Sequence, residues 1–340
     1  MSMRIAVDVM GSDLGSAVIT RGALNAQKAH DDIHLLLVGA SDEIRAVCEA
    51  EGVDESKYDV IDTSVVIGMD EHPIEALKAK RDASLVKAVA LVSDGKADAV
   101  VSPGSTGALV AASQLMLRLL PGVRRAGIVT TLPALEGRFT ILDVGANPNS
   151  KPAHLFQYGV MGSLFSQACM QVEKPRVAML SIGSEKGKGN PLIKSAFSQL
   201  DKAEINFVGN IEGHDIFQGK ADVVVCDGFV GNVVLKIAEG LSDALISLFK
   251  TTAQELELLN DPAVRKMFGV VKQRVDWTEV GGAQLLGVNG VVVVAHGRSN
   301  EAAIQGAVST ARRVVEAKLN QGIIEALYKR PSNASAAASL

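Results

Sequence analysis

The stretch VVSPGSTGALVAA, from Val100 to Ala112, has the pattern of a buried strand that turns through glycine and serine into a helix. Similar apolar runs recur along the chain, and amphipathic helical patterns stand between most of them. This alternation predicts βαβ units and a parallel sheet. We expect strands at Ile5–Val9, Ile33–Val38, Tyr58–Ile61, Ala99–Ser102, Gly127–Thr131, Phe139–Asp143, Val177–Ile182, Ile205–Val208, Val223–Cys226 and Gly290–Ala295. The expected helices include Ala17–His30, Ser84–Ser93, Thr106–Leu119 and Lys151–Met170.

Two segments depart from this alternation. The expected strands at 127–131 and 139–143 lie too close for a crossover helix, so we expect a hairpin and a mixed, mostly parallel sheet. A long helical pattern starts at Gly228, and Asp261-Pro262 opens a second helix. A long helical hairpin should therefore occupy about 229–275. No linker divides the chain, which favours a single two-lobed α/β catalytic unit over 1–330, followed by a disordered tail at 331–340.

The composition argues against several classes of protein. The 340 residues are 47% hydrophobic and 21% charged, which suits a globular chain with a sizeable core. A net charge of −4 without basic clusters argues against nucleic-acid binding. The three cysteines lie far apart, which favours a reducing cytoplasm. Neither an apolar signal-peptide core nor a run of about 18 uncharged apolar residues is present.

Polar residues and glycines follow several expected strands at their carboxyl ends. In a parallel sheet these ends share one edge, where ligands bind, so we expect one anion site built from them. Taken singly, each feature is also typical of a tight turn or a helix N-cap. The candidate residues are Asp8, Gly11, Asp13, Ser102, Gly104, Ser105, Thr106, Asn147, Asp227, Gly228, Asn232 and His296.

A further candidate is the stretch SIGSEKGKGNPLIK, from Ser181 to Lys194, which is typical of either a solvated turn or an anion cradle. It is not a P-loop, because that motif needs serine or threonine after its lysine. Placed after a strand, it adds Lys188, Gly189 and Asn190 to the candidate anion site. Asn190-Pro191 should begin the next helix and aim its first amides at the same place.

Other catalytic arrangements find little support. Cys226 stands at a strand end, but the neighbouring Asp227 would raise the pKa of its thiol, so packing is the better interpretation. The chain has no GxSxG elbow and no GxGxxG after its first strand. His/Glu spacing typical of a metal site is missing too. We expect neither a metal nor a cofactor.

Several blocks, taken in order, resemble the bacterial phosphate acyltransferase family of phospholipid synthesis. They include AVDVMGSD, DEHPIEALKAKRDAS, ADAVVSPGSTGAL, TLPALEGRFTILDVGAN, PRVAMLSIGSEKGKGN, ADVVVCDGFVGNVVLK and GGAQLLGVNGVVVVAHGRSN, and the match runs from about Met3 to Ala326. The resemblance implies a three-layer α/β/α sandwich of the isocitrate/isopropylmalate dehydrogenase and phosphotransacetylase type. It also implies transfer of a fatty acyl group from acyl carrier protein to inorganic phosphate, and the acyl phosphate then acylates glycerol 3-phosphate.

The same resemblance implies a cytoplasmic homodimer that associates peripherally with the membrane and could meet the next acyltransferase of the pathway. It singles out Lys188 as the cation on phosphate or the developing oxyanion, and Asn232 as a donor to the carbonyl. The chain departs from the family's usual pattern at Ser12, Pro103, Ser105 and Ala83. Ser105 stands where the family's usual pattern has an amide side chain.

Three alternatives stay open. A phosphotransacetylase acting on acyl-CoA would share the fold and the anion site. A dehydrogenase of the related fold is weaker, because paired metal-binding aspartates and a nucleotide fingerprint are missing. A non-catalytic membrane scaffold is the third. The apolar stems of the helical hairpin favour dimer packing, whereas its basic, amphipathic tip around Leu256–Val271 is also typical of lipid contact.

Overall fold

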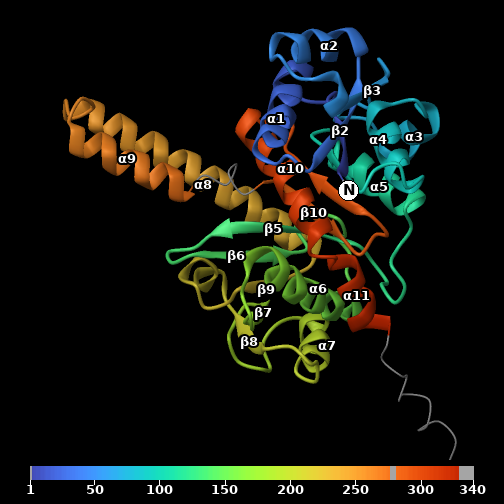
Figure 1. Cartoon of the computed structure of the whole chain (residues 1–340). Helices are drawn as coiled ribbons and strands as arrows, with labels where there is room; N and C mark the ends of the chain where they lie inside the picture. The colour runs from blue at the N-terminus through green and yellow to red at the C-terminus, as the bar shows by residue number, and fades with distance from the viewer. Residues whose placement is uncertain (1, 276–280, 329–340) are drawn as a thin grey trace, which may run out of the picture.

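The computed structural model describes residues 2–275 and 281–328, so the tail expected at 331–340 lies outside the described residues. One 11-stranded sheet runs through the molecule in the order β3-β2-β1-β4-β11-β10-β5-β6-β9-β7-β8 (Figure 1). The strands are β1 (Met3–Asp8), β2 (Ile33–Gly39), β3 (Tyr58–Asp62), β4 (Ala99–Ser102), β5 (Gly127–Pro133), β6 (Arg138–Leu142), β7 (Val177–Leu180), β8 (Phe207–Ile211), β9 (Val223–Val225), β10 (Ala283–Leu286) and β11 (Val291–Val294).

Helices cover both faces of this sheet, because neighbouring residues of a strand point to opposite faces. Val101 packs into one apolar core and Val100 into the other. The first core holds α1 (Ser16–Ala29), α2 (Ser41–Ala50), α6 (Pro152–Met170), α7 (Pro191–Leu200), α10 (Glu301–Glu316) and α11 (Leu319–Tyr328). The second holds α3 (Pro73–Ala79), α4 (Ser84–Ser93), α5 (Thr106–Met116) and the start of α8 (Gly228–Glu255). The predicted α/β/α sandwich is confirmed.

The centre of the sheet contains two reversals, of which the sequence predicted one. β5 and β6 pair antiparallel, with Val129 opposite Leu142, and form the expected hairpin. β10 was not expected, because its four residues AQLL include a glutamine and stand between glycine-rich segments. It pairs antiparallel with both β11 and β5.

These reversals overturn the expectation that all the polar strand ends share one edge. β1, β4 and β11 are mutually parallel, and three antiparallel pairings separate β11 from β6. β6, β9 and β7 are parallel to one another and therefore run against the first group. Their carboxyl ends therefore point in the opposite direction, although the register across β10 and β5 brings the ends of β11 and β6 close together at the centre of the sheet. Local patterns could not show this, because strand direction is set by pairing across the sheet.

The helical hairpin is present, with α8 followed by α9 (Pro262–Val275), and it extends away from the sandwich (Figure 1). Only the first turns of α8 reach the core, where Gly228, Gly231 and Glu239 are buried. From Ile237 onward the helix exposes a series of apolar side chains, namely Ile237, Leu241, Leu245, Leu248 and Phe249. None of the helices in the described ranges combines the length and the apolar character needed to cross a bilayer.

Candidate active site

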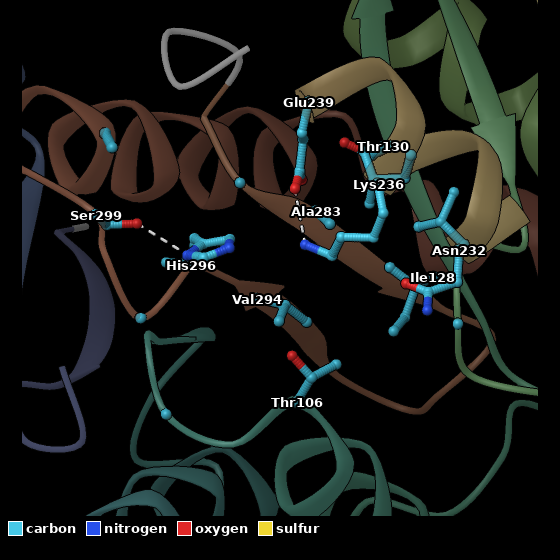
Figure 2. A pocket seen from close by; sticks show the side chains of 18 of the residues that line it. Thr106, Ile128, Thr130, Asn232, Lys236, Glu239, Ala283, Val294, His296 and Ser299 are labelled. Atoms are coloured by element: carbon cyan, nitrogen blue, oxygen red, sulfur yellow. Dashed lines mark hydrogen bonds and ion pairs between the residues drawn. The ribbon is translucent and has the colours of Figure 1, made fainter. Parts of the chain in front are cut away.

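A cavity of about 540 Å³ lies where the two strand groups meet, within the size range of small-molecule sites. The turn after β4 lines one side, the turn after β11 another, and the first turns of α8 a third (Figure 2). Its floor is the face of β5. The larger apolar side chains of the lining are Met69, Ile128, Leu132, Val144, Leu235 and Val294.

α8 brings an amide, a cation and an acid to this cavity. Asn232, Lys236 and Glu239 follow one another at helical spacing, so they share one face of the helix. Lys236 Nζ lies 2.8 Å from Glu239 Oε2, and Figure 2 shows the lysine side chain directed into the cavity. Sequence reasoning named Asn232 but missed the other two, although their spacing from Asn232 was a usable signal.

The turn after β4 is held from behind by a buried carboxyl group. Ser102 Oγ donates a hydrogen bond of 2.7 Å to Asp8 Oδ2, and the Gly104 N–H donates to Ser102 Oγ over 3.1 Å. Asp8 Oδ1 accepts from the Met10 N–H. Burial raises the pKa of Asp8 to about 6, against the opposing effect of these hydrogen bonds. The network fixes the backbone that leads to Thr106 on the cavity wall.

Gly11 and Ser105 complete this turn without lining the cavity. Gly11 has a φ of +73°, and a Cβ there would lie 3.1 Å from the Gly104 Cα, so the approach requires glycine. Ser105 is the N-cap residue of α5, and its side chain makes no capping hydrogen bond. The first N–H groups of α5 are therefore left to the cavity side, where Thr106 and Gly107 lie.

His296 enters the cavity from the turn after β11. Its backbone N–H donates to Ser299 Oγ over 3.0 Å, and its Nδ1 accepts from the Arg298 N–H over 3.2 Å. The neutral ring therefore carries its proton on Nε2. Burial, followed by the charge of Lys236, lowers the pKa of His296, so a neutral imidazole faces the site near pH 7. Asp13 joins this wall because its N–H donates to the Gly297 carbonyl over 2.9 Å.

Asp143 organises the loop after β6, which supports α8. Its Oδ1 accepts from the N–H groups of Ile128, Gly145 and Ala146, and its Oδ2 accepts from the Asn147 N–H over 2.7 Å. The buried Asp143 carboxyl has a raised pKa because desolvation outweighs these bonds. The hydrogen bonds to the Asp143 carboxyl group hold this loop in place beneath Asn232.

Cys226 lies against the same loop, and its Sγ donates weakly to the Asp143 carbonyl. Burial, together with the charges of Asp143 and Asp227, raises the pKa of the Cys226 thiol well above its ordinary value. A thiol with a raised pKa is a poor nucleophile. The structure therefore agrees with a packing role.

The predicted site residues separate into three groups. Five line the cavity: Asp13, Gly104, Thr106, Asn232 and His296. Seven lie directly behind its walls, at the carboxyl ends of β1 and β4 or in the segments that follow β1, β4, β6 and β9: Asp8, Gly11, Ser102, Ser105, Asn147, Asp227 and Gly228. Asn147 Nδ2 donates to the Ala126 carbonyl and to Tyr158 Oη, so its amide is used in packing.

The third group, Lys188, Gly189 and Asn190, follows β7 and is not part of the cavity lining. Lys188 is exposed. Asn190 is the N-cap of α7, as predicted, but its Oδ1 accepts from the Ile193 N–H and so occupies the helix end itself. The neighbouring Lys186 pairs with Asp201 at 2.6 Å.

The family model described as "Fatty acid synthesis protein" matches residues 3–322. The chain belongs to this family. The phosphate acyltransferase of Desulfitobacterium hafniense is 46% identical over 330 residues, covering 96% of this chain and 97% of that protein. The phosphate acyltransferase of Heliobacterium modesticaldum is 47% identical over 323 residues, covering 92% and 94%.

The expected phosphate acyltransferase resemblance is thus confirmed, and membership of the fatty acid synthesis protein family makes the chain an acyltransferase of lipid synthesis. Among solved structures, a phosphotransacetylase from Streptococcus pyogenes superposes with a TM-score of 0.63 at 18% identity, covering 93% of this chain and 94% of that one. This likeness shows that the chain described here has the phosphotransacetylase fold.

Proposed function

We propose that the protein transfers a fatty acyl group from the thioester of acyl carrier protein to inorganic phosphate. The products are an acyl phosphate, which serves to acylate glycerol 3-phosphate, and the free thiol of the carrier. The observation that carries the proposal is the composition of the cavity in a member of this family. Its lining combines groups that can bind an anion with apolar residues, as a phosphate and an acyl chain require.

The chemistry needs no nucleophile from the enzyme. A phosphate oxygen attacks the thioester carbonyl, and the C–O bond forms as the carbonyl oxygen becomes an oxyanion. The intermediate then expels the thiolate as the C–S bond breaks, and the proton of hydrogen phosphate passes to the sulfur. Donors placed at the oxyanion lower the barrier most, and positioning of the two substrates contributes the rest.

The lining residues can be assigned to these tasks. The Asn232 amide is the proposed donor to the oxyanion, because it stands on the first turns of α8 above the apolar floor. The turn from Gly104 to Thr106, with the start of α5, is the proposed cradle for phosphate. The neutral His296 ring carries its proton on Nε2, so it can donate a hydrogen bond to a ligand without repelling the Lys236 ammonium.

The catalytic role of Lys188 stays a prediction of the resemblance. The residue is exposed beyond β7 and outside the lining, so that role requires a substrate or a chain movement to bring it to the reacting atoms. A Lys188→Ala variant tests it directly.

We further propose that the hairpin of α8 and α9 joins two copies through its stems and contacts the cytoplasmic face of the membrane through its tip. The exposed apolar residues of α8 support the first part. At the tip, Met267 is exposed and two bases, Arg265 and Lys266, stand beside it. A mixture of apolar and basic residues suits an anionic lipid surface.

The reaction is tested with purified protein, phosphate and either acyl carrier protein or coenzyme A as the acyl donor. Acyl phosphate is trapped as the hydroxamate, and released thiol is measured in parallel. The proposal predicts equal amounts of the two products with the carrier-bound acyl group. Faster turnover with acyl-CoA would identify a phosphotransacetylase, and no acyl phosphate from either donor would leave a non-catalytic scaffold.

A further inference from the structure

Lys236 is the one lysine or arginine among the described residues that line the cavity. We infer that Lys236, together with the N-terminus of α5, forms the phosphate site. The inference rests on the proposed function and names the cation of that site. It assigns phosphate binding to a residue of α8 in place of Lys188 in the turn after β7.

The geometry leaves the Lys236 ammonium available to a ligand. An ammonium group has three N–H donors, and the 2.8 Å contact with Glu239 Oε2 engages one of them. The Lys236 side chain is 52% exposed, whereas that of Glu239 is 11% exposed. The buried acid therefore fixes the direction of the lysine, and its remaining donors face the open cavity (Figure 2).

Glu239 also limits how tightly an anion can bind. Its charge partly offsets that of Lys236, so a phosphate dianion meets a weakened cation. A substrate that must leave as part of the product gains from moderate binding. The Lys236–Glu239 pair thus orients phosphate while keeping its binding moderate.

The N-terminus of α5 supplies the opposing half of the site. The N-cap side chains of Asn190, Asp227 and Asn300 accept from the first N–H groups of α7, α8 and α10, whereas the N-cap residues of α1 and α2 make no such bond. Ser105 makes no such bond at α5. The positive end of an 11-residue helix therefore faces the cavity that Lys236 also lines.

The test compares Lys236→Gln and Lys236→Arg with Lys250→Gln, an exposed lysine farther along the same helix. Calorimetric titration with inorganic phosphate, in the absence of any acyl donor, measures binding alone. Steady-state assays then give KM for phosphate and for acyl carrier protein. Loss of a charged hydrogen-bond donor should raise both Kd and KM for phosphate at least about tenfold in Lys236→Gln.

KM for the acyl carrier should change less than about twofold, because the lysine contacts phosphate and not the acyl chain. Lys236→Arg should recover most of the phosphate affinity, and Lys250→Gln should match the wild type. Melting temperatures within a few degrees of the wild type show that the variants are folded.

Wild-type phosphate binding by Lys236→Gln would overturn the inference, as would a loss found in Lys188→Ala instead. The titration separates this result from the proposed function. Lysine-dependent phosphate binding without acyl phosphate formation would uphold the site and refute the reaction. If Lys236→Gln forms acyl phosphate with an unchanged KM for phosphate, the reaction is upheld and the phosphate site is refuted.

Discussion

Asp8 should make the stability of the folded chain fall as the pH rises. Its carboxyl group is fully buried beneath the turn after β4, and its pKa rises from 3.8 to about 6. The folded state therefore holds this proton more strongly than the unfolded state. The resulting stabilisation is complete below about pH 4 and is lost as the pH passes through about 6.

The size of the effect follows from the pKa shift. Across the whole range the contribution is about 3 kcal/mol, and about 1 kcal/mol of it falls between pH 5 and pH 7. An Asp8→Asn variant does not titrate there, and its amide oxygen can still accept from the Met10 N–H. Compared with the wild type, the variant should therefore gain about 1 kcal/mol in unfolding free energy from pH 5 to pH 7.

Urea unfolding of both proteins at pH 5, 6 and 7 measures this difference. Using the difference between the two proteins cancels the titration of every other group. Parallel curves, within about 0.3 kcal/mol over that range, would mean that Asp8 is ionised in the folded chain with an ordinary pKa. The buried carboxyl would then need another source of stabilisation.

Three further predictions concern the site and the hairpin. Asn232→Ala should lower kcat by about 10² to 10³ with little change in melting temperature. Lys188→Ala should also lower kcat, as the family resemblance implies. Wild-type turnover in either variant would remove that residue from the mechanism. Gly231→Ala should lose at least about 3 kcal/mol in denaturant unfolding, because its Cβ would lie 1.9 Å from the Asp143 carbonyl oxygen, whereas Gly240→Ala on the same helix meets nothing within 4 Å and serves as the control. Met267→Glu combined with Phe268→Glu should abolish flotation with anionic liposomes, and unchanged flotation would exclude the tip as the lipid contact.

The sequence predicted the layered fold because its buried strands are short runs of β-branched residues between amphipathic helices. Val100 and Val101 show the pattern: both are fully buried, one in each core. The helix start at Asn190 was predictable for a local reason as well, since a side-chain cap followed by proline needs no distant contact.

The arrangement of the site was less predictable, because it depends on pairing across the sheet. The strands from β6 onward run against β4 and β11, and the turn of Lys188 follows β7, which β9 separates from β6, so that turn does not line the cavity with Thr106. Lys236 was overlooked because a lysine on an amphipathic helix is ordinarily solvated. Only the packing of α8 against β6 and the loop after it shows that this lysine faces a cavity.

The central claim is that phosphate itself attacks the acyl thioester in this cavity. Phosphate labelled with ¹⁸O at all its oxygens tests that claim directly when it is incubated with the purified protein and acyl carrier protein bearing a fatty acyl group. Mass spectrometry should find acyl phosphate that retains every labelled oxygen, with release of one carrier thiol for each molecule formed. Unlabelled fatty acid as the product, or thiol release that does not depend on phosphate, would contradict the account.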